Sequence, residues 1–565
     1  MKSLRPDGLR RLARRWRTAG PLHGLTTATW GVAALLASWS AWEFLRVALA
    51  RRTFPYGLEW MEGGMLMHVL RVLQGEPLYP RPSPEFMPFL YGPGYSYAAA
   101  AVAKVSEAGL PALRLLSLLA TIAILLLIFR LVFVSTRNAW VAAVSSGVFV
   151  GTFELSGTWF DLARVDSLAL ALGLAALTLV QEEVRGPRRS WSLMLGGLLL
   201  GLAVLTKQTM LVLLPAAAWA ALMLPGSRSA EAPSVDPAGA GPRGSGPQGP
   251  EPQGPARWPP ELWHPELGRR RAELRALALF GGAFVAILAV VALALQIQSD
   301  GWFFYYVFEL PSTHGMKGRE HLLRAFWMDE LPRQLPLATT AGVVLLCGFP
   351  LRLGVRRHVF FWLLCASCLA GSYLSRLHMG SFTNDLMPGH AALAIAFGVV
   401  LHAATRVPVA TARLSAGLLA IAQLLLLLPS GWQRHVPGPN DYAAGDRVVE
   451  TIRSLPGDVL VVNHPHLAWL AGKRPFAHQM ALVDVFEADR DPRGVRELLE
   501  ARWAPLFQQR AFSGIVLDND WYIFMRPLRR AYAHTETLQF QGRALLPKVG
   551  TQLRPSWVYT PKLKQ

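Results

Sequence analysis

The stretch FPYGLEWMEGGMLMHVLRVLQGEPLYPRPSPEFMPFLYGPGYSY, residues 54–97, is the longest polar interruption between the first apolar segment and the apolar body that follows. It places Glu59 and Glu62 just beyond that first segment. The two carboxylates are three residues apart, so they share one face if the segment from Trp60 onward begins a helix. Two interpretations stay open. They are acids of an active-site loop near a bilayer surface, or solvated acids that the dipole favours in the first turn of a helix.

Composition indicates a membrane protein with several crossings. Of the 565 residues, 52% are hydrophobic and only 16% are charged, and the apolar runs recur at the length of a membrane span. The formal net charge is +19, but the arginines cluster between the apolar runs, as they do in cytoplasmic loops. The positive charge therefore indicates which connections are cytoplasmic, and no nucleic-acid partner is expected.

The cysteines predict neither a disulfide framework nor a metal site. Cys347, Cys365 and Cys368 all lie inside apolar segments. Cys365 and Cys368 form a CxxC pair, but no other ligand pair lies nearby at metal-binding spacing. We interpret this pair as helix packing.

The connections between apolar runs predict a polytopic α-helical protein whose basic N-terminus is cytoplasmic. The first apolar run is too long for the core of a cleaved signal peptide and suits a signal anchor. The segment at about 92–105 is too short to cross and predicts a surface or re-entrant helix. When successive connections are placed on alternate sides of the membrane, the sequence predicts about eleven crossings. The expected crossings are at about 28–49, 112–134, 139–157, 167–181, 191–205, 209–224, 276–298, 336–351, 358–374, 387–404 and 412–429.

The expected domains follow from this topology. They are a cytoplasmic N-terminus (1–27), a membrane core (28–225) with a first outer loop (50–111), a cytoplasmic linker (226–270), a second membrane bundle (271–430) and a C-terminal domain (440–565). The linker is rich in Pro, Gly and Ser and is expected to be disordered. In the last part the apolar runs shorten to those of a small α/β domain on the exoplasmic side, with a helix at 446–454 and strands at 459–463 and 514–518.

Ionisable residues gather at the expected outer ends of the spans, where charge near a bilayer marks a functional site. For Lys207 we expect an anionic partner, the alternative being a lysine that snorkels to the membrane surface. Arg164 and Asp166 either pair with each other or cap the next span; in a turn, Arg164 is free to hold a phosphate. The candidates are Glu59, Glu62, Asp161, Arg164, Asp166, Lys207, Arg376, His378, Asn384 and Asp385.

The order of several segments resembles the GT-C superfamily of membrane glycosyltransferases, over roughly the first 430 residues. It is most similar to the bacterial branch, glycosyltransferase family 39-like, related to protein O-mannosyltransferases and to the aminoarabinose transferase of lipid A. The segments are WMEGG, FMPFLYGPGYSY, LRLLSLLA, LARVDSLALALGLAAL, GLLLGLAVLTKQTMLVLLP and TNDLMPGHAALAIAFG.

The resemblance implies transfer of a sugar from a polyprenyl-phosphate donor on the outer face of a bacterial inner membrane, with inversion and without a nucleotide. The first-loop acid then acts as general base and basic residues hold the leaving phosphate. Met61 stands where many relatives carry the aspartate base. This leaves Glu62, which we favour, or Glu59.

In that scheme Asp166 is the expected second acid, and Arg164 and Lys207 bind the phosphate. From their place at the outer ends of the spans, Arg376, His378 and Asn384 are further expected substrate-binding residues. No cofactor is expected, although some members of the superfamily use a divalent metal. The sugar and the acceptor, whether lipid, glycan or protein, stay open.

Two other classes of function remain. A transporter or lipid flippase would carry charges at mid-span, for which Glu43 and Arg46 are the best candidates, although a local ion pair explains them. The second alternative is a non-catalytic scaffold protein with the same fold. In the C-terminal domain, His464 and His466 either bind a ligand at the end of a strand or mark a plain strand-to-turn transition, which is the more common case.

Overall fold

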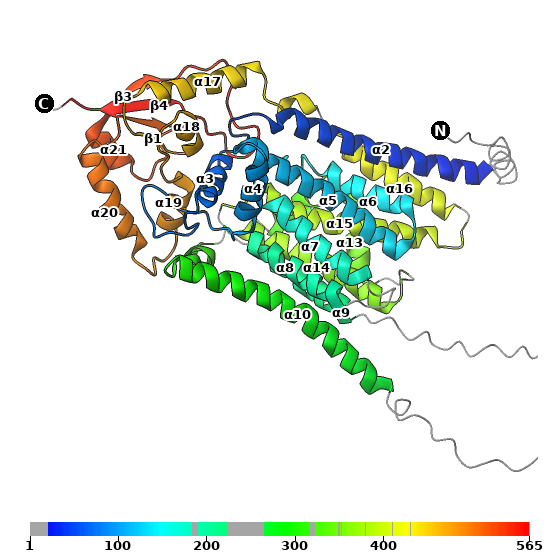
Figure 1. Ribbon diagram of the computed structural model, residues 1–565. Helices are drawn as coiled ribbons and strands as arrows, with labels where there is room; N and C mark the ends of the chain where they lie inside the picture. The colour runs from blue at the N-terminus through cyan, green and yellow to red at the C-terminus, as the bar shows by residue number, and fades with distance from the viewer. Residues whose placement is uncertain are drawn as a thin grey trace, which may run out of the picture.

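The computed structural model describes residues 21–182, 190–222, 265–315, 323–348, 351, 353–378, 380–409, 411–429 and 431–563. These residues form a bundle of helices with a smaller mixed α/β domain at one end (Figure 1). Most of the predicted basic N-terminus and nearly all of the predicted linker lie outside the described residues.

Five helical segments within these residues are long and apolar enough to cross a membrane. Some of these segments expose large apolar side chains, such as Leu126, Val290 and Ile297, which suits a surface in contact with lipid. The five segments are α2 (Pro21–Arg52), α5 (Leu110–Thr136), α10 (Pro265–Gln298), α14 (Val355–Leu377) and α15 (Met387–Thr405), the last preceded by the short turn η7 (Thr383–Leu386).

Six shorter apolar helical segments coincide with the remaining six expected spans. They are α6 (Ala139–Gly151), α7 (Asp166–Glu182), α8 (Ser190–Thr206), η2 (Gln208–Leu213) continued by α9 (Leu214–Leu222), α13 (Pro336–Leu346) and α16 (Ala412–Leu426). Each predicted span therefore corresponds to a helix. These six are shorter than the roughly 20 residues of a typical crossing, so the count of eleven crossings stays a prediction.

The helices pack closely where glycines face a neighbouring backbone. A Cβ atom at Gly197 of α8 would lie 2.1 Å from the carbonyl oxygen of Phe280 in α10, and one at Gly201 would lie 2.2 Å from a methyl group of Ile287. Small residues at such a contact let two backbones approach. In α2, Glu43 and Arg46 form a 2.5 Å ion pair, the local explanation expected for these two residues.

The three cysteines, Cys347, Cys365 and Cys368, are all unpaired, and the last two are buried in α14. Burial among helices agrees with the packing role that their apolar surroundings predicted.

The first loop, residues 53–109, holds two short helices, α3 (Glu62–Leu73) and α4 (Gly94–Val105). The short helix expected at about 92–105 is therefore present as α4. Helix α3 begins at Glu62, so Glu59 lies in the turn before it, and the two acids do not share a helix face. The peptide N–H of Glu62 donates to the carbonyl of Glu59 at 3.1 Å, which closes this turn.

A second loop region connects α10 to α13 through the short elements α11 (Trp302–Phe304), η4 (Tyr305–Glu309), η5 (Pro311–Thr313) and η6 (Ala325–Glu330). Its aromatic side chains pack against the first loop, where the rings of Tyr79 and Phe303 are 5.1 Å apart. This contact brings two segments that are distant in sequence to the same end of the bundle.

The C-terminal domain, residues 439–563, has the α/β character that the sequence predicts. Four strands form one mixed sheet in the order β1-β2-β4-β3, with β1 parallel to β2 and the other pairs antiparallel. They are β1 (Val459–Val461), β2 (Gly514–Leu517), β3 (Tyr532–Thr537) and β4 (Trp557–Pro561). The last strand in the chain therefore lies inside the sheet.

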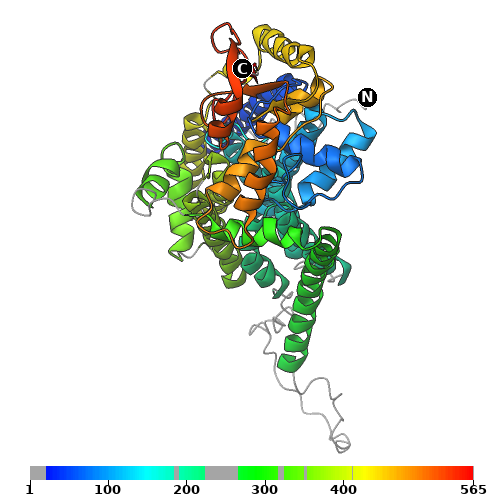
Figure 2. The same cartoon turned by 90° about the vertical axis from the view of Figure 1, so that its left-hand side faces the viewer.

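The helices of this domain are α17 (Pro439–Ser454), α18 (Pro465–Leu470), α19 (Gln479–Phe486), α20 (Val495–Gln508) and α21 (Met525–Ala531). Trp503 of α20 is fully buried and stacks with Phe524, their ring centroids 5.3 Å apart. Figure 2 looks at the molecule from this end, with the domain in orange and red beside the blue first loop. Helix α18 packs against α3, so the domain covers the first loop.

Candidate active site

Glu62 is the first residue of α3, and its carboxylate is buried and fully hydrogen-bonded. Arg114 of α5 donates to it from two nitrogens, at 2.9 Å to Oε1 and 2.6 Å to Oε2. The peptide N–H groups of Ala163 and Leu58 donate to the same oxygens at 2.8 and 2.7 Å. Burial acts to raise the pKa of the Glu62 carboxyl, but Arg114 and these N–H groups outweigh it and hold the pKa below its usual value. Glu62 thus anchors the first loop to α5 as an ionised group.

Glu59 has a different environment, although it is also only 1% exposed. Its Oε2 accepts a hydrogen bond from Nη1 of Arg164 at 2.9 Å and another from the peptide N–H of Met61 at 3.1 Å. Burial raises the pKa of the Glu59 carboxyl to about 7, because it outweighs the opposing effect of Arg164. Glu59 can therefore take up and release a proton near neutral pH.

Arg164 lies in the irregular turn between α6 and α7 and does not pair with Asp166. Its Nη2 donates to the hydroxyl of Tyr91 at 2.7 Å, and its guanidinium lies 5.2 Å from the ring centroid of Trp159. The indole N–H of Trp159 in turn donates to Oδ2 of Asp166 at 2.9 Å. Trp159 therefore contacts both Arg164, which pairs with Glu59, and Asp166.

Lys207, the residue between α8 and η2, lies between two carboxylates. Its Nζ is 2.7 Å from Oδ1 of Asp166 and 2.8 Å from Oδ1 of Asp385. The Asn384 side chain donates to the same oxygen of Asp166 at 2.9 Å. The expected anionic partners of Lys207 are therefore carboxylates of this chain. The Lys207 side chain is 12% exposed, and the two carboxylates use two of the three N–H donors of its ammonium.

Two predicted site residues make their contacts elsewhere. Arg376, in the last turn of α14, forms a two-point ion pair with Glu330 of η6. The ring of His378 lies 5.3 Å from that of His314. Both stand near the end of α14 that leads to Asn384, but the contacts of Arg376 are structural.

Sequence reasoning did not identify several partners of the candidate residues. Tyr91 lies in the aromatic close of the first loop, and Trp159 lies two residues before Asp161; aromatic residues in those motifs were the available signal. Asp161 itself receives a two-point ion pair from the fully buried Arg51, at 2.5 and 2.8 Å. Like the pair between Arg114 and Glu62, it fixes the loops around the site.

The arrangement combines a proton acceptor with fixed positive charge. Glu59, Asp166 and Asp385 supply three carboxylates, while Arg164 and Lys207 supply two cations, all of them buried or nearly so. Among the described residues, no group of three or more His, Cys, Asp or Glu side chains is arranged to hold a metal ion. A site of this kind can take a proton from one ligand and bind an anion from another.

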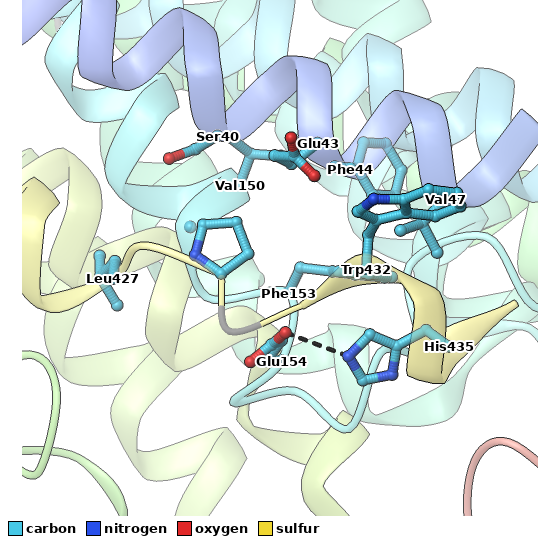
Figure 3. Close-up of a pocket in the computed structure, with 12 residues that line it drawn as sticks. Ser40, Glu43, Phe44, Val47, Val150, Phe153, Glu154, Leu427, Trp432 and His435 are labelled. Atoms are coloured by element: carbon cyan, nitrogen blue, oxygen red, sulfur yellow. Dashed lines mark hydrogen bonds and ion pairs between the residues drawn. The ribbon is translucent and has the colours of Figure 1, made fainter.

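A separate pocket lies between α2, the end of α6 and the segment after α16 (Figure 3). Its volume is about 20 Å³, enough for about one water molecule. Glu43 and Glu154 face it from different elements, and Oε1 of Glu43 has no hydrogen-bond partner among the described residues. None of its lining residues belongs to the cluster around Lys207, so we do not include it in the candidate active site.

A wider open groove of about 680 Å³ runs between the first loop, the end of α10 and the start of α20. Its lining residues include Arg81, Asp300, Trp302 and Arg493. The groove therefore lies at the surface, between the first loop and the C-terminal domain.

One family model matches part of the sequence. It is described as dolichyl-phosphate-mannose-protein mannosyltransferase, and it covers residues 88–235. These residues contain Tyr91, Arg164, Asp166 and Lys207. None of the curated proteins matches the sequence significantly.

Solved structures of one bacterial protein share the fold over nearly the whole chain. The apo structure of ArnT from Cupriavidus metallidurans has a TM-score of 0.56 at 12% identity, covering 94% of this chain and 97% of ArnT. The structure of the same protein bound to undecaprenyl phosphate has a TM-score of 0.53 at 12% identity, covering 91% and 97%. An Archaeoglobus fulgidus oligosaccharyltransferase has a TM-score of 0.46 at 11% identity, covering 90% and 72%. The family match and the ArnT fold confirm the resemblance that the sequence motifs indicated.

Proposed function

We propose, from the premise that this chain is a membrane glycosyltransferase with the GT-C fold, that it moves a sugar from a polyprenyl-phosphate-linked donor to an acceptor hydroxyl. The structure of ArnT in complex with undecaprenyl phosphate supports a donor of this chemical class. The arginine-rich connections, which we expect to be cytoplasmic, support a reaction on the opposite, exoplasmic side of the membrane.

The observation that carries the proposal is the ion pair between Arg164 and Glu59, whose pKa burial raises to about 7. A general base works best when its pKa lies near the operating pH, because it is then ionised yet still attracts a proton. Glu62 is less suitable, since both of its oxygens already accept hydrogen bonds from Arg114 and from the backbone. We therefore propose Glu59 as the base and Glu62 as its structural support.

The reaction then proceeds as an inverting displacement. Glu59 accepts the proton of the acceptor hydroxyl, and the acceptor oxygen forms a bond to the anomeric carbon. The bond from that carbon to the phosphate oxygen breaks, and its electron pair leaves with the polyprenyl phosphate. Arg164 and Lys207 stabilise the negative charge that develops on this phosphate.

Asp166 and Asp385 hold Lys207 in place before the donor binds, and Asn384 in turn donates to Asp166. An ammonium fixed in this way needs little rearrangement when the phosphate charge develops. Arg376 and His378 lie before the turn that carries Asn384, and in this proposal they have no direct role in the chemistry.

Release of polyprenyl phosphate in proteoliposomes, from a panel of polyprenyl-phosphate sugars, tests the proposal. We expect Glu59→Gln to lower kcat by about 10²–10⁴-fold, the usual contribution of a general base. We also expect Lys207→Met to lower kcat, because the variant lacks the ammonium that stabilises the leaving phosphate in this proposal. Glu85→Gln, an exposed acid of the same loop, is the matched control and should retain wild-type turnover.

The outcomes separate the possible assignments. Undiminished turnover in Glu59→Gln, with loss in a folded Glu62→Gln protein, would move the base to Glu62. No turnover by the wild-type protein with any donor of the panel would overturn the proposed function.

A further inference from the structure

The C-terminal domain contacts the backbone on both sides of Glu59. The peptide N–H of Val549 donates to the carbonyl of Leu58 at 3.0 Å. On the other side, Nε2 of His478 is 3.2 Å from the carbonyl oxygen of Trp60. The two carbonyls that flank Glu59 are therefore both held by residues more than 400 positions later in the chain.

The hydrogen bonds of His478 define its tautomer. Its Nδ1 accepts a hydrogen bond from the peptide N–H of Met480 at 3.0 Å, so in the neutral ring Nε2 carries the proton and donates to Trp60. The ring is 3% exposed and lies 5.3 Å from the rings of both Trp60 and Phe89. Burial lowers the pKa of His478 to about 3, so the ring stays neutral at ordinary pH.

The same domain also touches the Glu59 side chain. Gly550 has φ +73°, and a Cβ atom there would lie 3.2 Å from Cγ of Glu59. A glycine at this position lets the domain backbone approach the carboxylate arm closely. The segment that contains Val549 and Gly550 therefore bounds both the backbone and the side chain of Glu59.

A fourth contact fixes the start of α3. A Cβ atom at Gly63 would lie 2.0 Å from Nδ1 of His466, so the ring of His466 occupies the space above this glycine. His466 is 1% exposed, and neither of its ring nitrogens has a hydrogen-bond partner among the described residues. Its neighbour His464 pairs with Asp518 at 3.1 Å within the domain. The segment after β1 thus serves as a packing surface for α3.

We propose that the C-terminal domain forms part of the catalytic site, with His478 as a positioning residue for Glu59. The inference rests on the proposed function, because it assigns Glu59 the role of base. A general base works only when it lies within hydrogen-bond reach of the proton it removes. A displacement of about 1 Å can cost about a hundredfold in rate. By holding both neighbouring carbonyls, the domain fixes Glu59 at that position.

Two substitutions at one position separate positioning from folding. Asn at 478 can reproduce the Nδ1 acceptor toward Met480 but cannot reach the Trp60 carbonyl, whereas Gln places an N–H near the position of Nε2. We expect His478→Asn to lower kcat at least about tenfold with the donor KM within about twofold. His478→Gln should recover most of the lost kcat. His534→Asn, an exposed histidine of β3, is the matched control and should behave as wild type.

Amide hydrogen exchange of residues 57–64 gives a readout that does not depend on activity. We expect faster exchange in His478→Asn and wild-type exchange in His534→Asn, because only the first loses the bond to the Trp60 carbonyl. Faster exchange with an unchanged kcat, or unchanged exchange and kcat, would overturn the positioning role while leaving the proposed function intact. An active His478→Asn with a raised donor KM alone would also overturn it. A wild-type protein without transfer activity would instead overturn the proposed function.

Discussion

At the scale of single residues, two glutamates three positions apart have opposite environments. Glu62 receives two N–H bonds from Arg114 and three from the backbone, whereas Glu59 receives one from Arg164 and one from the peptide of Met61. Both are buried, so the number and charge of their donors decide which of them stays ionised. Burial thus yields a firm ionic anchor at one position and a titrating carboxyl at the other.

The pKa of Glu59 leads to a prediction for the pH dependence of turnover. The base acts only when it is ionised, so kcat/KM should be low at pH 5, rise about tenfold per pH unit, and level off above about pH 7. Steady-state rates in proteoliposomes between about pH 5 and pH 9 check this. An acid limb centred near pH 4 would be inconsistent with Glu59 as the base.

At this scale the sequence predicted most members of the cluster but not their pairing. Their place at the outer ends of predicted spans marks Glu59, Arg164, Asp166, Lys207 and Asn384 as candidates, and the structure brings them together. That Arg164 turns toward Glu59, and that Lys207 lies between two aspartates, depends on the irregular turns that connect the helices. Their dihedral angles have no periodic signal in the sequence.

At the scale of elements, the contact between α8 and α10 depends on glycines. Gly197 and Gly201 face the backbone and a methyl group of α10 at distances that exclude any larger side chain. Between helices in a membrane, such close approach supplies van der Waals packing where the hydrophobic effect contributes little. By contrast, Gly281 on α10 faces open space, and a Cβ atom added there would have no other atom within 4 Å.

We expect Gly197→Val to destabilise the protein by roughly 1–3 kcal/mol, because the valine methyl groups would force α8 and α10 apart. Gly281→Val adds the same side chain on a helix face with free space and should change the stability little. Thermal unfolding in the same detergent, followed by loss of the monodisperse peak, compares the two. Equal midpoints for both variants would show that the glycine contact does not hold α10 in place.

The helices were largely predictable from the sequence, because each expected span is an apolar run bounded by charged or turn residues, and each corresponds to an observed helix. The first residue of α3 could not be predicted from the sequence. The helix begins at Glu62, and the turn before it is closed by Glu59, a boundary that the run from Trp60 onward did not mark. Boundaries of this kind depend on tertiary contacts, here the pair with Arg114.

At the scale of the whole molecule, the sidedness of the chain remains a prediction from its arginines. The basic connections predict that the turn at Arg137 is cytoplasmic and that the C-terminal domain is exoplasmic. Both Arg137 and Glu450 of α17 are exposed, so each can carry a probe.

We therefore expect a single cysteine at 450 to react with a membrane-impermeant maleimide in intact spheroplasts. A single cysteine at 137 should react only after permeabilisation. The three native cysteines are replaced by serine in both proteins, and labelling is read by gel shift. The reverse pattern would place the C-terminal domain in the cytoplasm and overturn the exoplasmic site of reaction.

The position of β4 has a consequence for the biosynthesis of the protein. This strand follows every other described helix and strand in chain order, yet it lies between β2 and β3 and completes the sheet only when it arrives. Val549 and Gly550, just before it, reach the turn of Glu59. Since domains form as the chain emerges from its N-terminus, nascent and truncated chains keep an unfinished Glu59 turn. With Glu59 as the proposed base, we expect transfer activity to begin only after β4 has joined the sheet, once synthesis of the chain is complete.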